Sequence, residues 1–199
     1  MAPTKKAAAT RTRLLDAAAT VLAHGDGDFE MADLATTAGV SGGLAYHHFG
    51  SKAGVIAAVV DDFYTRWIAA TNQRFQGEEG WTAQERRREL ASIAFLFDDP
   101  LAPIVLEKRT HSAEVAAIEA DHRRAMIAAT QQRIEAGQVG GEVALALDAA
   151  TAASATFGAL TQSTLAAITS RGRPDVQQFA DQLWTVLSSG LLGDRAAVG

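Results

Sequence analysis

The sequence contains no cysteine, and this absence excludes a disulfide scaffold and a cysteine-based zinc site. No apolar run approaches the ~20 residues that a membrane-spanning helix needs, and the basic N-terminal segment lacks the apolar core of a secretory signal. We therefore expect a cytoplasmic protein that has no membrane partner. Proline is scarce, with four residues in 199, whereas alanine, the strongest helix former, is abundant. This composition predicts an all-α protein.

Positive charge is scarce overall and unevenly placed. The formal net charge is −5, which argues against a protein coated in positive charge. Residues 1–15 nevertheless hold four basic residues and no acidic one, whereas residues 16–52 hold one basic and five acidic residues. A basic arm on an acidic body is typical of a protein that meets a polyanion with one end, although a solvated, disordered N-terminus has the same composition. The arm consists of Lys5, Lys6, Arg11 and Arg13.

The spacing of apolar residues and turn formers divides the chain into two groups of helices. Three helices, near residues 5–24, 31–38 and 41–48, form the first group. We place a domain boundary near residue 50, so that residues 1–50 and residues 51–199 form separate domains. The second group is predicted as six helices, near residues 52–75, 82–97, 101–109, 112–136 and 142–170 and from Val176 onward.

Residues 31–49 have the composition of a helix-turn-helix. Ala35 is small enough to lie where two helices touch, Gly39 suits a turn that needs positive φ, and Ala45 packs the second helix against the first. Ser41 offers a side-chain oxygen as N-cap of that second helix. In this motif the second helix enters the major groove of DNA, with its N-terminal residues nearest to the bases.

The same helix begins with two glycines, although each glycine inside a helix costs about 1 kcal/mol relative to alanine. We interpret Gly42 and Gly43 as positions where the missing side chain lets backbone N–H groups approach a phosphate. The partial positive charge of the helix N-terminus assists that contact. The alternative is that the glycines mark a loop and that residues 41–48 are barely helical.

The segment FEMADLATTAGVSGGLAYHHFGSKAGVI resembles the DNA-binding segment of the TetR family of bacterial one-component transcriptional regulators. The family pattern is a small residue, Gly, Val and Ser in the turn, then Gly, an apolar residue, Tyr, a variable residue, His and Phe, and a Lys after a short turn. The matching residues are Ala38, Gly39, Val40, Ser41, Gly43, Ala45, Tyr46, His47, His48, Phe49 and Lys52. The chain length and the helices beyond the motif also suit this family.

The resemblance implies a role in DNA binding for each matched position. Tyr46, His48 and Lys52 would contact phosphates. Bases or backbone would be contacted from Ser41, Gly42, Leu44 and His47.

This chain departs from the family pattern at several of these positions. Gly42 stands where a polar residue is common, and Leu44, where Thr is common, offers only apolar contact, such as to a thymine methyl group. Ala32 stands where an arginine often meets phosphate. We expect the basic arm, with Lys5 and Arg11, to compensate for these missing contacts.

The resemblance also implies a six-helix C-terminal domain for ligand binding and dimerisation. Small residues in the 142–170 helix and an apolar face on the last helix suit an intermolecular four-helix bundle. The alternative is that both helices pack within one monomer. The interface candidates are Ala146, Ala150, Ala153, Leu183, Trp184, Leu187 and Leu191. The ligand candidates are Trp67, Phe95, Glu107, His111, Met126 and Phe157. Residues of these types are more often ordinary core or surface residues than ligand contacts.

The sequence shows no catalytic or metal-binding pattern. Adjacent His47 and His48 point about 100° apart on a helix and do not chelate one metal, and no nucleophile elbow or phosphate loop is present. We therefore predict no enzyme activity, no metal and no cofactor. The predicted function is a homodimeric repressor that binds near-palindromic double-stranded operator DNA and is released by a small-molecule effector. A regulator without an inducer and a helical protein-interaction module remain the alternatives.

Overall fold

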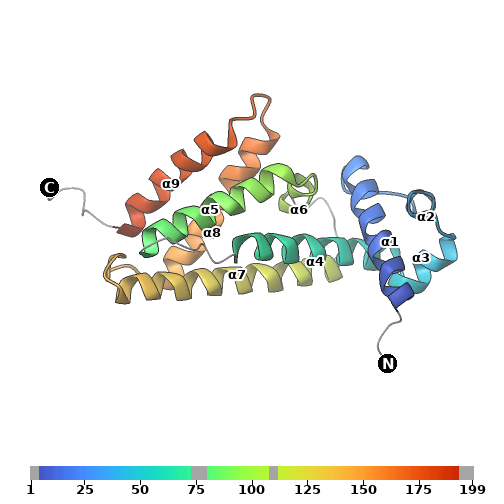
Figure 1. Cartoon of the computed structure of the whole chain (residues 1–199), viewed down its shortest axis with the longest axis horizontal. Coiled ribbons are helices and arrows are strands. Elements are labelled where there is room, and N and C mark those ends of the chain that lie inside the picture. The colour runs from blue at the N-terminus through green and yellow to red at the C-terminus, as the bar shows by residue number, and fades with distance from the viewer. Residues whose placement is uncertain (1–4, 73–79, 108–111, 193–199) are drawn as a thin grey trace. The chain divides into compact units, whose positions relative to one another are not determined.

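The structure is a computed structural model that describes residues 5–72, 80–107 and 112–192, with side chains from residue 9 onward. These residues form nine α-helices and no strand (Figure 1), which confirms the predicted all-α class. The chain divides into two compact units, which we describe separately. The first unit comprises Met1–Thr65 and Pro100–Asp121, and the second comprises Arg66–Asp99 and His122–Gly199. No helix within the described ranges is long and apolar enough to cross a bilayer.

The first unit contains α1 (Lys5–His24), α2 (Met31–Ala38), α3 (Gly42–Phe49), the start of α4 (Lys52–Thr71), α6 (Ala102–Leu106) and the start of α7 (Ala113–Val139). Helix α2 packs against both α1 and α3 (Figure 1). One residue from each of α1, α2 and α3 is fully buried, namely Leu14, Leu34 and Ala45, so the three helices contribute to one core. Burial of such side chains typically stabilises a fold by about 1.5–3 kcal/mol for each leucine.

Two glycines fix the turns on either side of α3. Gly39 has φ of 62° and ψ of 41°, a left-handed conformation that favours glycine, and Val40 N–H donates to Ala35 O across this turn (3.0 Å). At the start of α4, a Cβ on Gly54 would lie 2.2 Å from the Phe49 carbonyl oxygen. A side chain there would force α3 and α4 apart, so the glycines set the angle at which α3 is presented.

The second unit contains α5 (Trp81–Asp98), α8 (Ala149–Thr169), α9 (Val176–Leu192) and the C-terminal parts of α4 and α7. Helices α5, α8 and α9 pack against one another in all three pairs. Part of the core is a cluster in which α7, α8, α9 and the segment before α8 meet. Its buried members are Ile134, Val143, Ala149, Ala153 and Leu191.

Helix α8 begins at Ala149 and not near residue 142 as predicted. Gly141 has φ of +75°, and Asp148 caps α8 by accepting from Thr151 N–H (2.8 Å). Glu142 lies before this helix and caps a different one, because its carboxylate accepts from the Trp81 N–H (2.6 Å) and the Thr82 N–H (3.0 Å) at the start of α5. The positive φ of Gly141 and the cap at Asp148 therefore decide where α8 begins, although the apolar spacing of the segment predicted an earlier start.

Candidate functional site

Helix α3 presents one face to solvent and buries the other. Ala45 is fully buried, whereas Tyr46 is 50% exposed. Gly42, Gly43 and His47 are also exposed. The structure therefore holds α3 by its inner face and leaves the N-terminal and outer residues open to a partner, as a recognition helix requires.

Neither the backbone conformation nor the packing of α3 requires glycine at Gly42 or Gly43. Helix α3 begins at Gly42, so the interpretation of this segment as a loop is wrong. A Cβ at Gly42 or Gly43 would meet no atom within 4 Å, and neither residue has a positive φ. The fold would accept alanine at both positions, so any requirement for glycine comes from outside the chain.

Ser41 occupies the N-cap position of α3, but it does not cap with its side chain. Its backbone is extended, with φ of −72° and ψ of 147°, and its side chain makes no capping hydrogen bond. The Ser41 carbonyl accepts from Leu44 N–H at 3.0 Å. The predicted side-chain cap is therefore wrong, and Ser41 is exposed to solvent.

Lys52 is paired with an acid inside the first unit. Its Nζ lies 2.6 Å from Asp28 Oδ1 and 5.4 Å from the centroid of the Phe29 ring. The hydrogen bond with Asp28 raises the pKa of Lys52, and the charges of Asp28, Glu30 and Tyr46 act in the same direction. The same bond lowers the pKa of Asp28. A phosphate that binds Lys52 must therefore compete with the Asp28 carboxylate.

Other predicted DNA contacts lie beside the same helix. The Arg11 guanidinium carbon is 5.4 Å from the centroid of the Phe49 ring, which places a cation from α1 next to the end of α3. His48 is half-buried, and its ring lies 5.8 Å from that of His47 with an interplanar angle of 72°. Leu44 is also half-buried. The Lys5 side chain lies outside the described residues.

The second unit contains a cavity of about 170 Å³ between parts of α4, α5, α7, α8 and α9. Its apolar wall includes the three tryptophans of the sequence, Trp67, Trp81 and Trp184, together with Phe157. Trp67 is fully buried, and its Nε1–H donates to Ser92 Oγ at 2.7 Å. The cavity is therefore rich in aromatic surface and has several polar groups in its wall.

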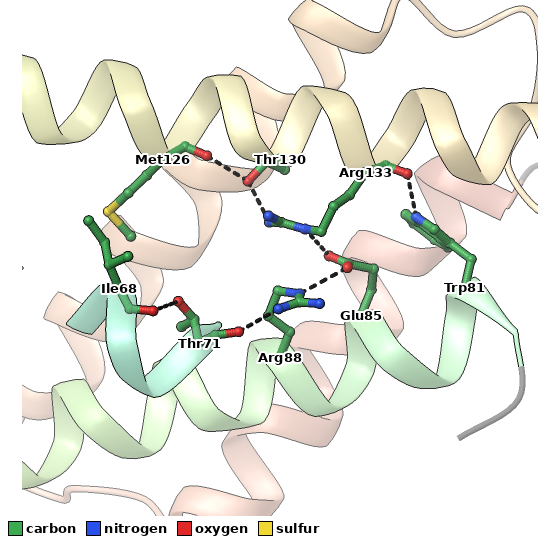
Figure 2. Close-up of polar contacts among 8 residues, drawn as sticks. All are labelled: Ile68, Thr71, Trp81, Glu85, Arg88, Met126, Thr130 and Arg133. Carbon is green, nitrogen blue, oxygen red and sulfur yellow. Dashed lines mark hydrogen bonds and ion pairs between the residues drawn. The ribbon is translucent and has the colours of Figure 1, made fainter. Parts of the chain in front are cut away.

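One side of the cavity is a continuous polar network that joins three helices (Figure 2). Glu85 of α5 accepts from Arg88 Nε and from Arg133 Nε, each at 3.0 Å. Arg88 also donates to the Thr71 carbonyl of α4, and Arg133 donates to Thr130 Oγ1 of α7 at 2.9 Å. Both guanidinium groups are thus held by protein acceptors, with the single carboxylate of Glu85 between them.

Glu89 is the second acid of the cavity wall and lies one turn after Glu85. It is 8% exposed, and its Oε1 atom has no hydrogen-bond partner among the described residues. Burial raises the pKa of Glu89 to about 8, and the negative charge of Glu85 adds to this effect. Glu89 is therefore mainly protonated at neutral pH in the empty cavity.

Three of the six predicted ligand residues, Trp67, Met126 and Phe157, line the cavity. Phe95 is not in the cavity lining, but its ring is stacked with that of Trp67, with 6.5 Å between centroids. Glu107 is an exposed residue of the first unit and does not line the cavity. His111 lies outside the described residues.

The residues predicted to form a dimer interface have different surroundings within one chain. Ala153, Leu183 and Leu191 are buried in the protomer, which does not fit a role in contacts with a second copy. Trp184 and Leu187 line the cavity, as does Leu191. Ala146 lies in the turn before α8, because that helix begins three residues later. Of the predicted set on α8 and α9, Ala150 alone is exposed.

The sequence interpretation missed the polar wall of the cavity. Glu85, Arg88, Glu89 and Arg133 are not among the predicted ligand residues, although all four line the cavity. A signal for them exists, because positions 81, 85, 88, 89 and 92 recur at helical spacing and fall on one face of α5. No cluster of three or more metal-binding side chains occurs in the part of the chain that the structure describes.

Part of the first unit matches a known family model. Residues 14–59 match the family model described as "Bacterial regulatory proteins, tetR family". A comparison with curated proteins finds no significant match. Among solved structures, the chain has the fold of several transcriptional regulators at low sequence identity.

The fatty acid degradation regulator FadR from Bacillus halodurans has a TM-score of 0.80 and 20% identity, over 91% of this chain and 95% of that one. FadR from Bacillus subtilis, solved in complex with stearoyl-CoA, has a TM-score of 0.80 and 19% identity, over 90% and 98%. TylP, a TetR regulator from Streptomyces fradiae, has a TM-score of 0.73 and 20% identity, over 98% and 92%.

Proposed function

We propose that this chain, a TetR-family transcriptional regulator by its DNA-binding segment and its fold, is a homodimeric repressor of a near-palindromic operator. A small molecule in the cavity of the second unit would release it from DNA. The observation that carries the proposal is the exposed outer face of α3, where two glycines that the fold does not require precede Tyr46 and His47. Such a surface suits close approach to a DNA backbone.

The DNA contacts would combine side chains with backbone groups. Tyr46 and His48 would contact phosphates, and Lys52 would join them after exchanging Asp28 for phosphate. Gly42 and Gly43 would bring the N-terminal N–H groups of α3 close to the backbone. Leu44 and His47 would contact bases, and Lys5 and Arg11 would add phosphate contacts from α1.

Dimerisation would use the faces of α8 and α9 that one protomer leaves uncovered. Val186 is 68% exposed, and Ala150, Ala155 and Gly158 are exposed on α8. Small residues there allow two copies to approach closely in a four-helix arrangement. A two-fold dimer would present two α3 helices to successive major grooves about 34–36 Å apart, hence the near-palindromic operator. Sedimentation of the wild type as a dimer and of Val186→Arg as a monomer would support this interface.

Release by a ligand requires that the ligand bind one conformation better than another. Helix α4 contains both Lys52, in the first unit, and Trp67, in the cavity wall of the second. A ligand that moves Trp67 would therefore act on the same helix that carries a DNA contact. The cavity favours this function over a regulator without an inducer, and the stearoyl-CoA bound to B. subtilis FadR supports a small-molecule effector, whatever its chemical class.

The experiment is selection of random double-stranded DNA by the purified protein at about 0.15 M salt, because protein–DNA affinity depends strongly on salt. An enriched inverted repeat is the expected result. Enrichment of no sequence would contradict the proposal and favour the protein-interaction module.

Tyr46→Ala then tests the surface, with Tyr46→Phe as the matched control for the hydroxyl group. We expect the alanine variant to lose more than about 1 kcal/mol of operator binding, the scale of a hydrogen bond to a charged group. Unchanged affinity in a titration of the selected operator would contradict the assignment of Tyr46.

A further inference from the structure

The two acidic side chains of the cavity wall differ in their hydrogen-bond partners. Glu85 is paired with both described arginines of the wall, since its two carboxylate oxygens accept hydrogen bonds from Arg88 and Arg133 (Figure 2). No other described residue of the wall is basic. Among the described residues, Glu89 therefore has no cationic partner in the cavity, although more than nine-tenths of the residue is buried.

A buried polar atom without a partner is costly for a fold and calls for an explanation. The Oε1 atom of Glu89 is such an atom, and the residue lines the cavity and not the closed core. The neighbouring carboxylate, Glu85, is already paired with Arg88 and Arg133, whereas the Glu89 carboxyl group is paired with no described cation. A bound ligand is therefore the natural partner for this carboxyl group.

The aromatic lining of the cavity favours the same kind of ligand. Trp67, Trp81, Trp184 and Phe157 all contribute to the wall, and the faces of aromatic rings attract cations, most strongly those of tryptophan. The Trp67 and Phe157 rings lie 6.1 Å apart between centroids. A carboxyl group among such rings offers an ammonium group both an ion pair and cation–π contacts.

We propose that the cavity binds a small amphipathic cation, whose ammonium group pairs with Glu89 and whose apolar part lies among Trp67, Met126 and Phe157. This inference rests on the proposed function, because it names the class of effector for that cavity. The volume of about 170 Å³ is close to the ~150 Å³ of a protein cavity that holds one benzene molecule. A ligand of the size of one aromatic ring with a short chain therefore suits the cavity.

Three probes that differ in one group test the proposal: 4-phenylbutylamine, 4-phenylbutanol and 4-phenylbutyrate. They carry the same apolar part with a cationic, neutral or anionic end. Tryptophan fluorescence reports binding at the site, because all three tryptophans of the chain line the cavity. We expect full-length protein at pH 7 to bind the amine about tenfold or more tightly than the alcohol, and the carboxylate most weakly.

Glu89→Gln keeps the shape of the side chain but cannot ionise to pair with an ammonium group, so this variant should bind the amine and the alcohol equally. Glu135→Gln is the matched control, because Glu135 is exposed on α7 and outside the cavity, and it should keep the preference for the amine. If Glu89→Gln does not fold, the relative affinities of the wild type for the three probes still test the proposal.

Three results would overturn the proposal. One is equal or tighter binding of the alcohol or the carboxylate, the latter pointing to Arg88 and Arg133. Another is a preference for the amine that survives in Glu89→Gln. The third is the absence of any fluorescence change with millimolar probe. DNA selection stays independent of these outcomes: an enriched inverted repeat without amine preference refutes the ligand class alone, whereas failure to select DNA refutes the proposed regulator.

Discussion

Replacement of Glu89 by glutamine should stabilise the empty protein, and the gain should depend on pH. The ordinary pKa of a glutamate is 4.5, and burial raises the pKa of Glu89 to about 8 in the folded chain. Between these two values the unfolded chain has released a proton that the folded chain keeps. The free energy of unfolding therefore falls as pH rises through this window, by 1.36 kcal/mol per pH unit, and becomes constant above about pH 8.

The size of the effect follows from the same values. At pH 7 the carboxyl group lowers the free energy of unfolding by about 3 kcal/mol, and above pH 8 by about 5 kcal/mol. Glutamine is close in shape to a protonated glutamate and does not ionise. We therefore expect Glu89→Gln to match the wild type near pH 4 and to exceed its free energy of unfolding by about 3 kcal/mol at pH 7.

Urea denaturation followed by tryptophan fluorescence measures this difference, because the three tryptophans all belong to the second unit. Wild type, Glu89→Gln and the exposed control Glu135→Gln would be compared at pH 4.5, 6, 7 and 8. Titration of other groups cancels when the variants are compared at one pH. A Glu89→Gln variant that is less stable than the wild type at pH 7, or a difference that does not grow with pH, would refute the reasoning, since the carboxylate would then be satisfied in the folded chain.

Three further predictions concern the first unit and the cap of α5. Asp28→Asn should free Lys52 from its ion pair, so that operator binding becomes severalfold tighter. The slope of log affinity against log salt concentration should steepen by about one phosphate contact. If neither the affinity nor this slope changes, Lys52 does not reach DNA. Gly43→Ala should raise the free energy of unfolding by about 0.5–1 kcal/mol. The same variant should bind the operator about tenfold more weakly, because the backbone loses a hydrogen bond to a charged phosphate. Equal or tighter binding would contradict a close approach of the α3 backbone to DNA. Glu142→Ala should lower the free energy of unfolding by about 1–2 kcal/mol, because the Trp81 N–H loses its acceptor, and an unchanged urea midpoint relative to Glu135→Ala would rule out this cap.

The helix-turn-helix was predictable because its information is local. Gly39 must adopt positive φ, Ala35 and Ala45 must be small and buried, and these requirements lie within a few residues of one another. The structure confirms the helices over 31–38 and finds α3 within one residue of the prediction. The pairing of Lys52 with Asp28 joins residues on either side of the motif, and no spacing rule indicates it.

The cavity depended on the tertiary structure, because its wall comes from five helices far apart in the sequence. Periodicity placed Trp184 and Leu187 on an apolar face, but it did not decide whether that face meets a second copy, the core or a cavity. Likewise, the sequence shows Glu85 and Glu89 one helical turn apart. Only the fold determines that Glu85 receives two arginines, one of them 48 residues away, while the Glu89 carboxyl is buried with one oxygen unpaired. By itself, the sequence determined the helices and the DNA-binding motif, since both follow from local backbone and packing requirements; burial and charge pairing in the cavity arise only when distant helices meet.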